Sequence, residues 1–470
     1  MNATEICYSD ATELAALIAK KELSPVEVVQ AHIDRIEAIN PKVNAVVTLI
    51  KQDALKAAKS AEAAVLRGDK LGPFHGVPFS IKDVIDTAGV ATKRGSKIFA
   101  NHVPDFDAPV VSRLKEAGAI PLFKSNCPEF SAWWETDNLV TGCTRNPWNL
   151  DRTPGGSSGG ESAAIAAGLS PMGLGSDVAI SVRGPAAMTG IVGLKASHGR
   201  IPYTRHFPSS LRPYWHIGPM ARSVRDVAAA FAVLNGPDGQ DGFGVYGKEA
   251  QPAGGLRSGQ PVRVGWLAAT GFGPVDPEIV ATVTAAAKFL RDSGCIVEPV
   301  DLPTLNDTDW YGPALTIYLG RLMPQLRPIM EGRDADLHVV GQGFKGAPDP
   351  SIADYVAAEA RVEELKDTFA AYFQKYDVLL CPVLPIVAPP FAMQEYEIAG
   401  QKVPSSHVTR ATVPFNLTGL PALSVPFRFH SQKLPMSVQL VSKWADEATI
   451  LNLGLLIEAA SEVHGKRPPL

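Results

Sequence analysis

Cysteine is scarce in this 470-residue chain and never forms a Cys-x-x-Cys pair. The five cysteines are odd in number and widely spaced, at Cys7, Cys127, Cys143, Cys295 and Cys381. This pattern argues against a disulfide scaffold and a zinc knuckle, and it is typical of a reducing compartment. The first residues also lack an apolar signal core. The sequence therefore predicts a cytoplasmic protein that needs no metal.

An excess of charge of either sign is also missing. Lys plus Arg number 44 and Asp plus Glu number 48, which gives a net charge of −4. Nucleic-acid binding through bulk positive charge is therefore not expected. Residues 378–393 form the longest uncharged stretch near the C-terminal end, but four prolines interrupt it and it is too short to cross a bilayer. We expect neither a nucleic acid nor a membrane as partner, and a homodimer is compatible with the sequence.

Helix signals dominate the first part of the chain. Asp10 is placed to cap a helix, and Ser24-Pro25-Val26-Glu27 is a capping box with proline at the first helical position. Asn40-Pro41 predicts the end of the helix that this box begins. An alanine-rich helix is expected over residues 53–66. Residues 1–68 are therefore predicted to be an N-terminal helical segment.

Strands and helices alternate through much of the remaining chain. The patterns predict strands over residues 77–85, 119–123, 262–267 and 295–300, and helices over residues 109–116 and 277–292. Such strand–helix–strand units favour parallel pairing with helices on the sheet faces, which predicts an α/β domain. Residues 303–350 mix proline, glycine and aromatic residues without a clear period. We expect an irregular lid or substrate region there.

The densest chemical signal is the run TPGGSSGGE over residues 153–161. Its glycines let the backbone come close to a ligand, although such runs are commonly flexible loops. A phosphate-binding loop would need a Lys-Ser/Thr pair after the last glycine, and none follows. A nucleophile elbow would need a strand before the GxSxG string and a histidine in a distinctive context, and neither is evident. A serine activated by a lysine is the third interpretation.

Motifs along nearly the whole chain resemble those of the amidase signature family, in the family's order. They are GVPFSIKD (76–83), NPWN and PGGSSGG (146–160), GSDVAISVRGPA (175–186), GIVGLK and GPMARS (190–223) and NLTGLPA (416–422). The resemblance implies one α/β domain over residues 1–470, with a mixed, mostly parallel central sheet flanked by helices. It places the signature core, which carries the catalytic residues, at residues 69–235.

The same resemblance implies a catalytic triad. Lys82 matches the terminal base, Ser157 the bridging serine after a cis peptide bond, and Ser181 the nucleophile. A serine hydroxyl needs a neighbouring base, and a lysine is a base only when burial lowers its pKa. The largely apolar strand over 77–85 could bury Lys82, whereas a solvated Lys82 would instead pair with a neighbouring aspartate. The implied reaction is acyl transfer without a metal or organic cofactor.

Backbone N–H groups of the loop before the nucleophile are expected to hold the oxyanion. The predicted oxyanion and substrate-binding residues are Val178, Ala179, Ile180, Gly156, Ser131 and Trp134. Ala179 and Ile180 stand where the family has two glycines, and Ser437 also replaces a usual glycine, which we interpret as a packing variation. Backbone donors survive these changes, but a β-branched Ile180 resists positive φ. We expect its side chain to fill space beside the substrate carbonyl.

Two further side chains bear on the substrate. If Trp134 faces the acyl pocket, it favours a flat or aromatic group, although it and Trp133 could equally be core aromatics. Arg183 follows the nucleophile closely, and we expect a buried structural arginine paired with Asp177 rather than a substrate ligand.

Three functions are compatible with these residues. The leading interpretation is a stand-alone amidase for small-molecule amides, whose nucleophile would serve equally for a carbamate or an ester. The second is the glutaminase subunit of a tRNA-dependent amidotransferase, which would need partner subunits. The third is a non-catalytic protein that uses the same pocket for binding.

Overall fold

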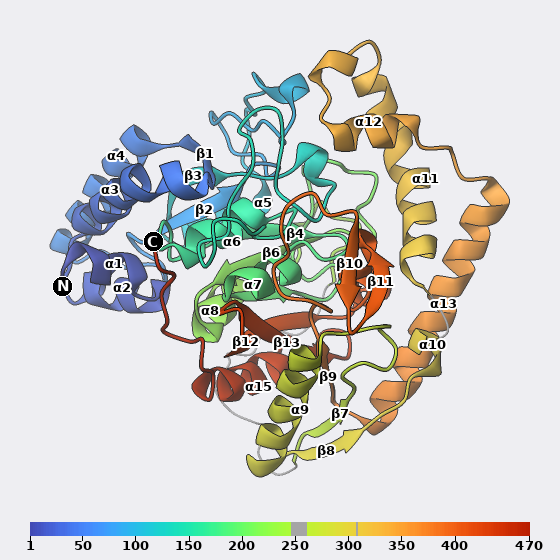
Figure 1. Ribbon diagram of the computed structural model, residues 1–470. Coiled ribbons are helices and arrows are strands. Elements are labelled where there is room, and N and C mark those ends of the chain that lie inside the picture. Colours follow the sequence, from blue (N-terminus) through green and yellow to red (C-terminus); the bar gives the residue numbers. More distant parts are fainter. Residues whose placement is uncertain (246–260, 307–308) are drawn as a thin grey trace.

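The computed structural model describes residues 1–245, 261–306 and 309–470. Within these residues, an 11-stranded sheet has the strand order β1-β3-β2-β4-β6-β5-β12-β13-β9-β7-β8 (Figure 1). Its strands are β1 (Val46–Leu49), β2 (Pro78–Lys82), β3 (Ile120–Ser125), β4 (Met172–Asp177), β5 (Val192–Lys195), β6 (His216–Ala221), β7 (Arg263–Trp266), β8 (Ile296–Pro299), β9 (Val378–Pro382), β12 (Ala422–Phe429) and β13 (Pro435–Ser442). A separate hairpin pairs β10 (Glu395–Ile398) with β11 (Gln401–Pro404).

Parallel pairing is confined to two parts of the sheet. One is β3-β2-β4 and the other is β9-β7-β8. The strands between them pair antiparallel, because β12 and β13 form a hairpin that inserts in the middle and pairs with β5 and β9. The predicted α/β domain with a mixed, helix-flanked sheet is therefore confirmed. The expectation that most of the pairing would be parallel is wrong.

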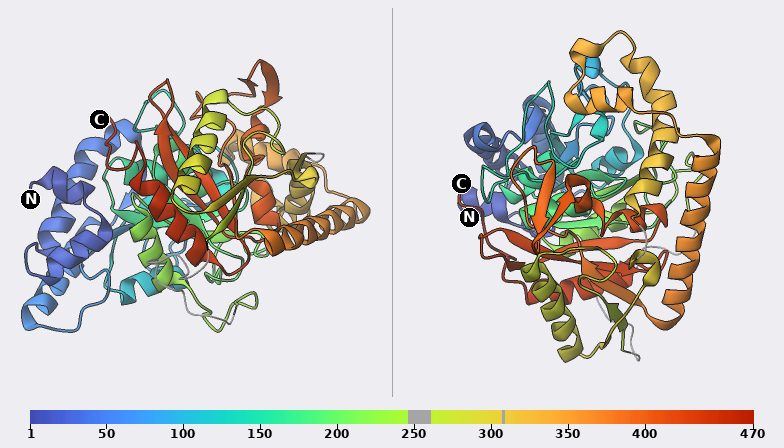
Figure 2. Two further views of the ribbon diagram at one scale, coloured as in Figure 1. Left: turned by 90° about the horizontal axis from the view of Figure 1, so that it is seen from below. Right: turned by 45° about the vertical axis from the view of Figure 1, so that its right-hand side comes forward.

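Helices cover both faces of this sheet (Figures 1 and 2). One layer joins α5 (Pro109–Glu116), α8 (Val224–Leu234), α9 (Pro277–Asp292) and α15 (Glu447–Ala459). The other face carries α6 (Gly159–Ala166) and α7 (Arg183–Thr189), which pack against each other. The N-terminal helices are α1 (Ala3–Tyr8), α2 (Ala11–Ala19), α3 (Pro25–Val43) and α4 (Lys51–Arg67), gathered beyond the β1 edge.

The local sequence signals place the helix starts near the N-terminus correctly, but the end of α3 and the cap of α2 differ from the expectation. The capping box of Ser24 and Glu27 is present, but α3 continues through Pro41 to Val43. This proline lies in the last turn of the helix, and Asn44, with φ 52°, closes the end by donating to the Asn40 carbonyl. Asp10 precedes α2 but its side chain makes no capping bond. The carboxylate of Asp226, on α8, accepts the first helical N–H groups instead.

The region expected to be irregular is largely helical. Residues 303–350 contain α10 (Pro303–Asn306), α11 (Tyr311–Met330) and α12 (Val339–Gly346), and α13 (Ile352–Lys375) follows. Residues 307 and 308 lie outside the described residues. The prediction of irregular structure is wrong, because α11 packs its apolar positions on α13 and the short α14 (Val413–Leu417). This packing outweighs the low helix propensity of the prolines and glycines in α11. A role as a lid stays a prediction.

The described helices include none that is long and apolar enough to cross a membrane. The sheet is instead buried on both faces, and all residues of β2, β4 and β13 are buried. Strands buried in this way hold any charged side chain at their ends out of water. Lys82, the last residue of β2, is such a side chain.

Candidate active site

Lys82 ends β2, between the parallel neighbours β3 and β4, and its side chain is fully buried. Its Nζ lies 2.7 Å from Ser157 Oγ and 3.0 Å from Ser176 Oγ. It also lies 3.4 Å from the carbonyl oxygen of Ser176, at the end of β4. The alternative of a solvated lysine paired with an aspartate is therefore excluded. The carboxyl ends of two parallel strands place this amine beside the glycine-rich loop, as expected for sites in α/β proteins.

Burial determines the protonation of this amine. Removal from water lowers the pKa of Lys82 from 10.5 to about 7, against the opposing influence of Cys127, Asp177 and Glu161. A substantial fraction of the amine is thus neutral near pH 7. A neutral lysine in contact with a serine hydroxyl can accept a proton, which a solvated lysine cannot do at this pH.

The glycine-rich loop gives Ser157 its place next to the lysine. The peptide bond between Gly156 and Ser157 is cis, as the resemblance implied. A Cβ atom on Gly156 would lie 2.7 Å from backbone atoms of Glu135, so only glycine allows this close approach. Ser131 donates a hydrogen bond of 2.9 Å to Ser157 Oγ. The bridging hydroxyl therefore contacts the amine and a second serine at once.

A neighbouring serine fastens this loop to the strand that leads to the nucleophile. Ser176 N donates to Ser158 Oγ, and Ser158 Oγ donates to the Ser176 carbonyl. Ser181 follows five residues later, in the turn between β4 and α7, and only 4% of it is exposed. Its hydroxyl forms no hydrogen bond with any described residue. The structure thus places the Ser157 hydroxyl in contact with both Lys82 and Ser131, and it places Ser181 in the adjoining turn.

In the turn before Ser181, each carbonyl group accepts a hydrogen bond, whereas the N–H groups find no acceptor among the described residues. The carbonyl of Val178 accepts from Tyr318, that of Ala179 from Arg183 and that of Ile180 from the Gly184 N–H. Among the described residues, the backbone N–H groups of Ala179, Ile180 and Ser181 have no hydrogen-bond acceptor. Free, fixed N–H groups beside a serine are the arrangement that can stabilise a developing oxyanion.

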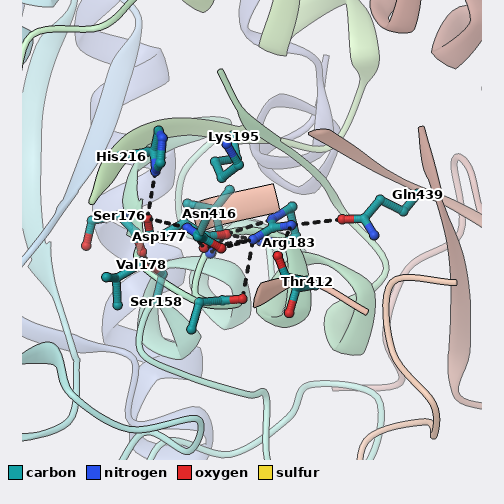
Figure 3. A network of polar contacts seen from close by, with 12 residues as sticks. Ser158, Ser176, Asp177, Val178, Arg183, Lys195, His216, Thr412, Asn416 and Gln439 are labelled. Atoms are coloured by element: carbon teal, nitrogen blue, oxygen red, sulfur yellow. Dashed lines mark hydrogen bonds and ion pairs between the residues drawn. The ribbon is translucent and has the colours of Figure 1, made fainter. Parts of the chain in front are cut away.

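The residues that flank this turn, Asp177 and Arg183, form a buried ion pair. Arg183 and Asp177 are both fully buried, and their side chains make two hydrogen bonds, of 2.9 and 3.0 Å. Arg183 also contacts Thr412, Asn416 and Gln439 (Figure 3). Burial raises the pKa of Asp177, but the charge and hydrogen bonds of Arg183, the charge of Lys195 and the Val182 N–H together outweigh burial and lower the pKa to about 2. The expectation of a structural arginine paired with Asp177 is confirmed.

The two residues that replace glycines do not strain the turn. Neither Ala179 nor Ile180 has a positive φ. Ile180 is 3% exposed and belongs to the hydrophobic core, and a Cβ atom on Gly184 would lie 2.4 Å from its Cγ1. Its side chain packs against the first turn of α7, and the expectation that it also fills space beside the substrate carbonyl stays a prediction. The glycine needed for this packing lies at position 184.

Trp133 and Trp134 form an aromatic pair that contacts the first residue of α11. Trp134 stacks on Trp133 with ring centroids 3.8 Å apart, and it meets Tyr311 of α11 edge to face at 6.2 Å. Trp134 is partly exposed and packs on the same core cluster as Val178 and Ala179. This partly exposed surface is suited to a flat apolar group.

Two contacts of the site were not assigned from the sequence. Ser176 lies in a recognised motif, and only the fold shows that its hydroxyl contacts Lys82. Tyr318 is one of several aromatic residues in the segment over 303–350, and nothing local signals its bond to Val178. The described residues contain no group of three or more His, Cys, Asp or Glu side chains that could hold a metal ion.

Comparison with known proteins places this geometry in a family. The family model described as Amidase matches residues 27–312 and 337–451. A glutamyl-tRNA(Gln) amidotransferase subunit from Moorella thermoacetica is 36% identical over 503 residues, covering 99% of both chains. The acylamidase of Rhodococcus erythropolis is 32% identical over 480 residues, covering 100% of this chain and 98% of the relative.

A solved structure shares the whole fold. It is a bacterial aryl acylamidase of the amidase signature enzymes, which is 28% identical with a TM-score of 0.89. The match covers 98% of this chain and 99% of that protein.

Proposed function

Because the chain belongs to the amidase family, we propose that it is a stand-alone hydrolase that cleaves the C–N bond of small-molecule amides through an acyl-enzyme on Ser181. The observation that carries this proposal is the fully buried Lys82 amine 2.7 Å from the Ser157 hydroxyl. With its pKa lowered to about 7 by burial, this amine can receive the proton that a serine nucleophile must lose.

The contacts support a two-step acyl transfer. Ser181 Oγ attacks the amide carbon while its proton passes to Ser157 and the proton of Ser157 passes to Lys82. No hydrogen bond joins the Ser181 and Ser157 hydroxyls in the structure, so the Ser181 side chain has to turn toward Ser157 as it attacks. The C–N bond then breaks as the amine takes a proton back from Lys82 through Ser157. Water attacks the acyl-enzyme by the same route and releases the acid.

The free N–H groups of the turn stabilise the charge that develops on the carbonyl oxygen. Removal of one such donor from an enzyme typically costs about a hundred- to a thousand-fold in rate. Because these donors belong to the backbone, the presence of Ala179 and Ile180 leaves them intact. The same donors serve an amide, a carbamate or an ester, since each presents a carbonyl oxygen.

The aromatic surface of Trp134 and Tyr311 supports aryl or other flat amides as the substrate class. A second candidate is the glutaminase subunit of a tRNA-dependent amidotransferase. It is favoured by the 36% identity to the Moorella thermoacetica protein over nearly the full length. That function would require partner subunits, and a site for a charged amino acid in place of an apolar surface.

The test uses the purified full chain and a matched Ser181→Ala variant. We expect aniline release from acetanilide-type amides, no ammonia from glutamine, and a loss of roughly 10⁴-fold or more in Ser181→Ala with an unchanged fold. Ammonia from glutamine as the main product would favour the amidotransferase function. Activity retained in Ser181→Ala would refute the mechanism, and binding without turnover in the wild type would indicate a non-catalytic protein.

A further inference from the structure

Helix α11 carries two tyrosines that contact the active site. Tyr311 and Tyr318 are seven residues apart, which is two helical turns and therefore one face of the helix. Tyr311 meets Trp134, whereas the Tyr318 hydroxyl donates a hydrogen bond of 2.5 Å to the Val178 carbonyl. One face of α11 thus touches both the aromatic surface and the turn that precedes the nucleophile.

The bond to Val178 has a consequence for the next N–H group. A peptide unit is planar and trans, so its C=O and N–H groups point in opposite directions. The C=O of Val178 and the N–H of Ala179 belong to the same unit. A donor that fixes the direction of this carbonyl therefore also fixes the direction of the Ala179 N–H.

The other two N–H groups of the turn are fixed in the same way, but by residues of α7. Arg183 holds the carbonyl of Ala179, which sets the N–H of Ile180. The Gly184 N–H holds the carbonyl of Ile180, which sets the N–H of Ser181. The first peptide unit of the turn, between Val178 and Ala179, differs because its carbonyl accepts from the side chain of Tyr318, on the distant helix α11.

From this geometry we infer that Tyr318 is a positioning residue, which aims the Ala179 N–H at the oxyanion by holding the Val178 carbonyl. The inference rests on the proposed function, since it assumes that Ser181 attacks a carbonyl. Burial raises the pKa of the Tyr318 phenol well above its usual value, so the phenol keeps its proton and donates throughout the working pH range. The neighbouring ring of Tyr214 packs against Tyr318 at 6.2 Å and restrains it.

The matched pair of variants is Tyr318→Phe and Tyr355→Phe. Both remove one phenol O–H and keep the ring, but Tyr355 donates within α13, to Glu359, at the same 2.5 Å. We expect Tyr318→Phe to lower kcat by roughly 10- to 100-fold, less than the loss of a whole oxyanion donor, with KM within about two-fold of wild type. Tyr355→Phe should leave both unchanged.

Two readouts separate a positioning role from a merely structural one. The thermal midpoint of Tyr318→Phe should match that of Tyr355→Phe, and the pH midpoint of activity should not move because Lys82 is untouched. Equal kcat in the two variants would overturn the inference, as would a loss confined to KM.

Hydrogen exchange across residues 178–182 gives a measurement that does not need turnover. Faster exchange in Tyr318→Phe than in Tyr355→Phe supports the inference, and equal exchange contradicts it. The proposed function fails separately, if Ser181→Ala keeps the activity of the wild type.

Discussion

The titration of Lys82 is the most direct consequence of its burial. Its pKa is lowered to about 7, so the fraction of neutral amine rises through the neutral range. We expect kcat/KM to increase about tenfold per pH unit below pH 7 and to level off above it. Lys82→Arg should be inactive at every pH in this range, because a guanidinium stays protonated and cannot act as the base.

The same shift predicts a change in stability with pH. Lowering the pKa from 10.5 to about 7 corresponds to about 5 kcal/mol against the charged form in the folded protein. Between these two values the unfolded chain holds the proton and the folded chain does not, so the free energy of unfolding rises with pH. From pH 7 to pH 9 the wild type should gain about 2 kcal/mol relative to Lys82→Met, which has no group to titrate.

Two measurements check this reasoning. The first is the pH profile of kcat/KM for wild type and Lys82→Arg with one aryl amide. The second is urea denaturation of wild type and Lys82→Met at the two pH values, with the difference in unfolding free energy compared. A flat activity profile, wild-type rates in Lys82→Arg, or a stability difference that does not change with pH would each refute a lysine that loses its proton on burial.

Two further predictions concern the turn and the aromatic surface. Gly184→Ala should lower the free energy of unfolding by about 1–3 kcal/mol through overpacking against Ile180. Because Ile180→Ala removes this contact, the loss in the double variant, measured by urea denaturation, should be smaller than the sum of the two single losses. An unchanged stability of Gly184→Ala would show that the contact is readily relieved. Trp134→Leu should reduce kcat/KM about tenfold for an aryl amide and much less for acetamide. An equal loss on both substrates would mean that Trp134 shapes the turn rather than the pocket.

Elements set by local signals could be predicted from the sequence with good boundaries. The helix over 109–116 and the helix from Pro277 to Asp292 match the structure, because proline at the first turn and a glycine after the end are short-range signals. Parallel pairing was expected where a helix joins two strands, and β2–β3 and β7–β8 do pair in parallel. The antiparallel centre could not be predicted in this way, because the hairpin of β12 and β13 enters the sheet from far along the chain.

Contacts between distant segments account for the other differences. The N-terminal end of α2 is capped by Asp226, more than 200 residues away. A capping rule that considers only neighbouring residues therefore predicts Asp10 instead. The helical state of α11 depends on its packing against α13. The hydrogen bond from Tyr318 to Val178 spans 140 residues and has no local counterpart.

The motifs predicted Lys82, Ser157 and Ser181 as the triad that we propose, whereas the departure at Ala179 and Ile180 could be interpreted only with the fold. An oxyanion site built from backbone N–H groups depends on the directions of its peptide units rather than on the side chains of the turn. Those directions are set by the groups that hold the carbonyls, which come from α7 and α11. The turn can therefore carry an isoleucine as long as position 184 leaves room for it. Sequence change is expected to be tolerated at position 179 and to be restricted at the residues that hold the carbonyls.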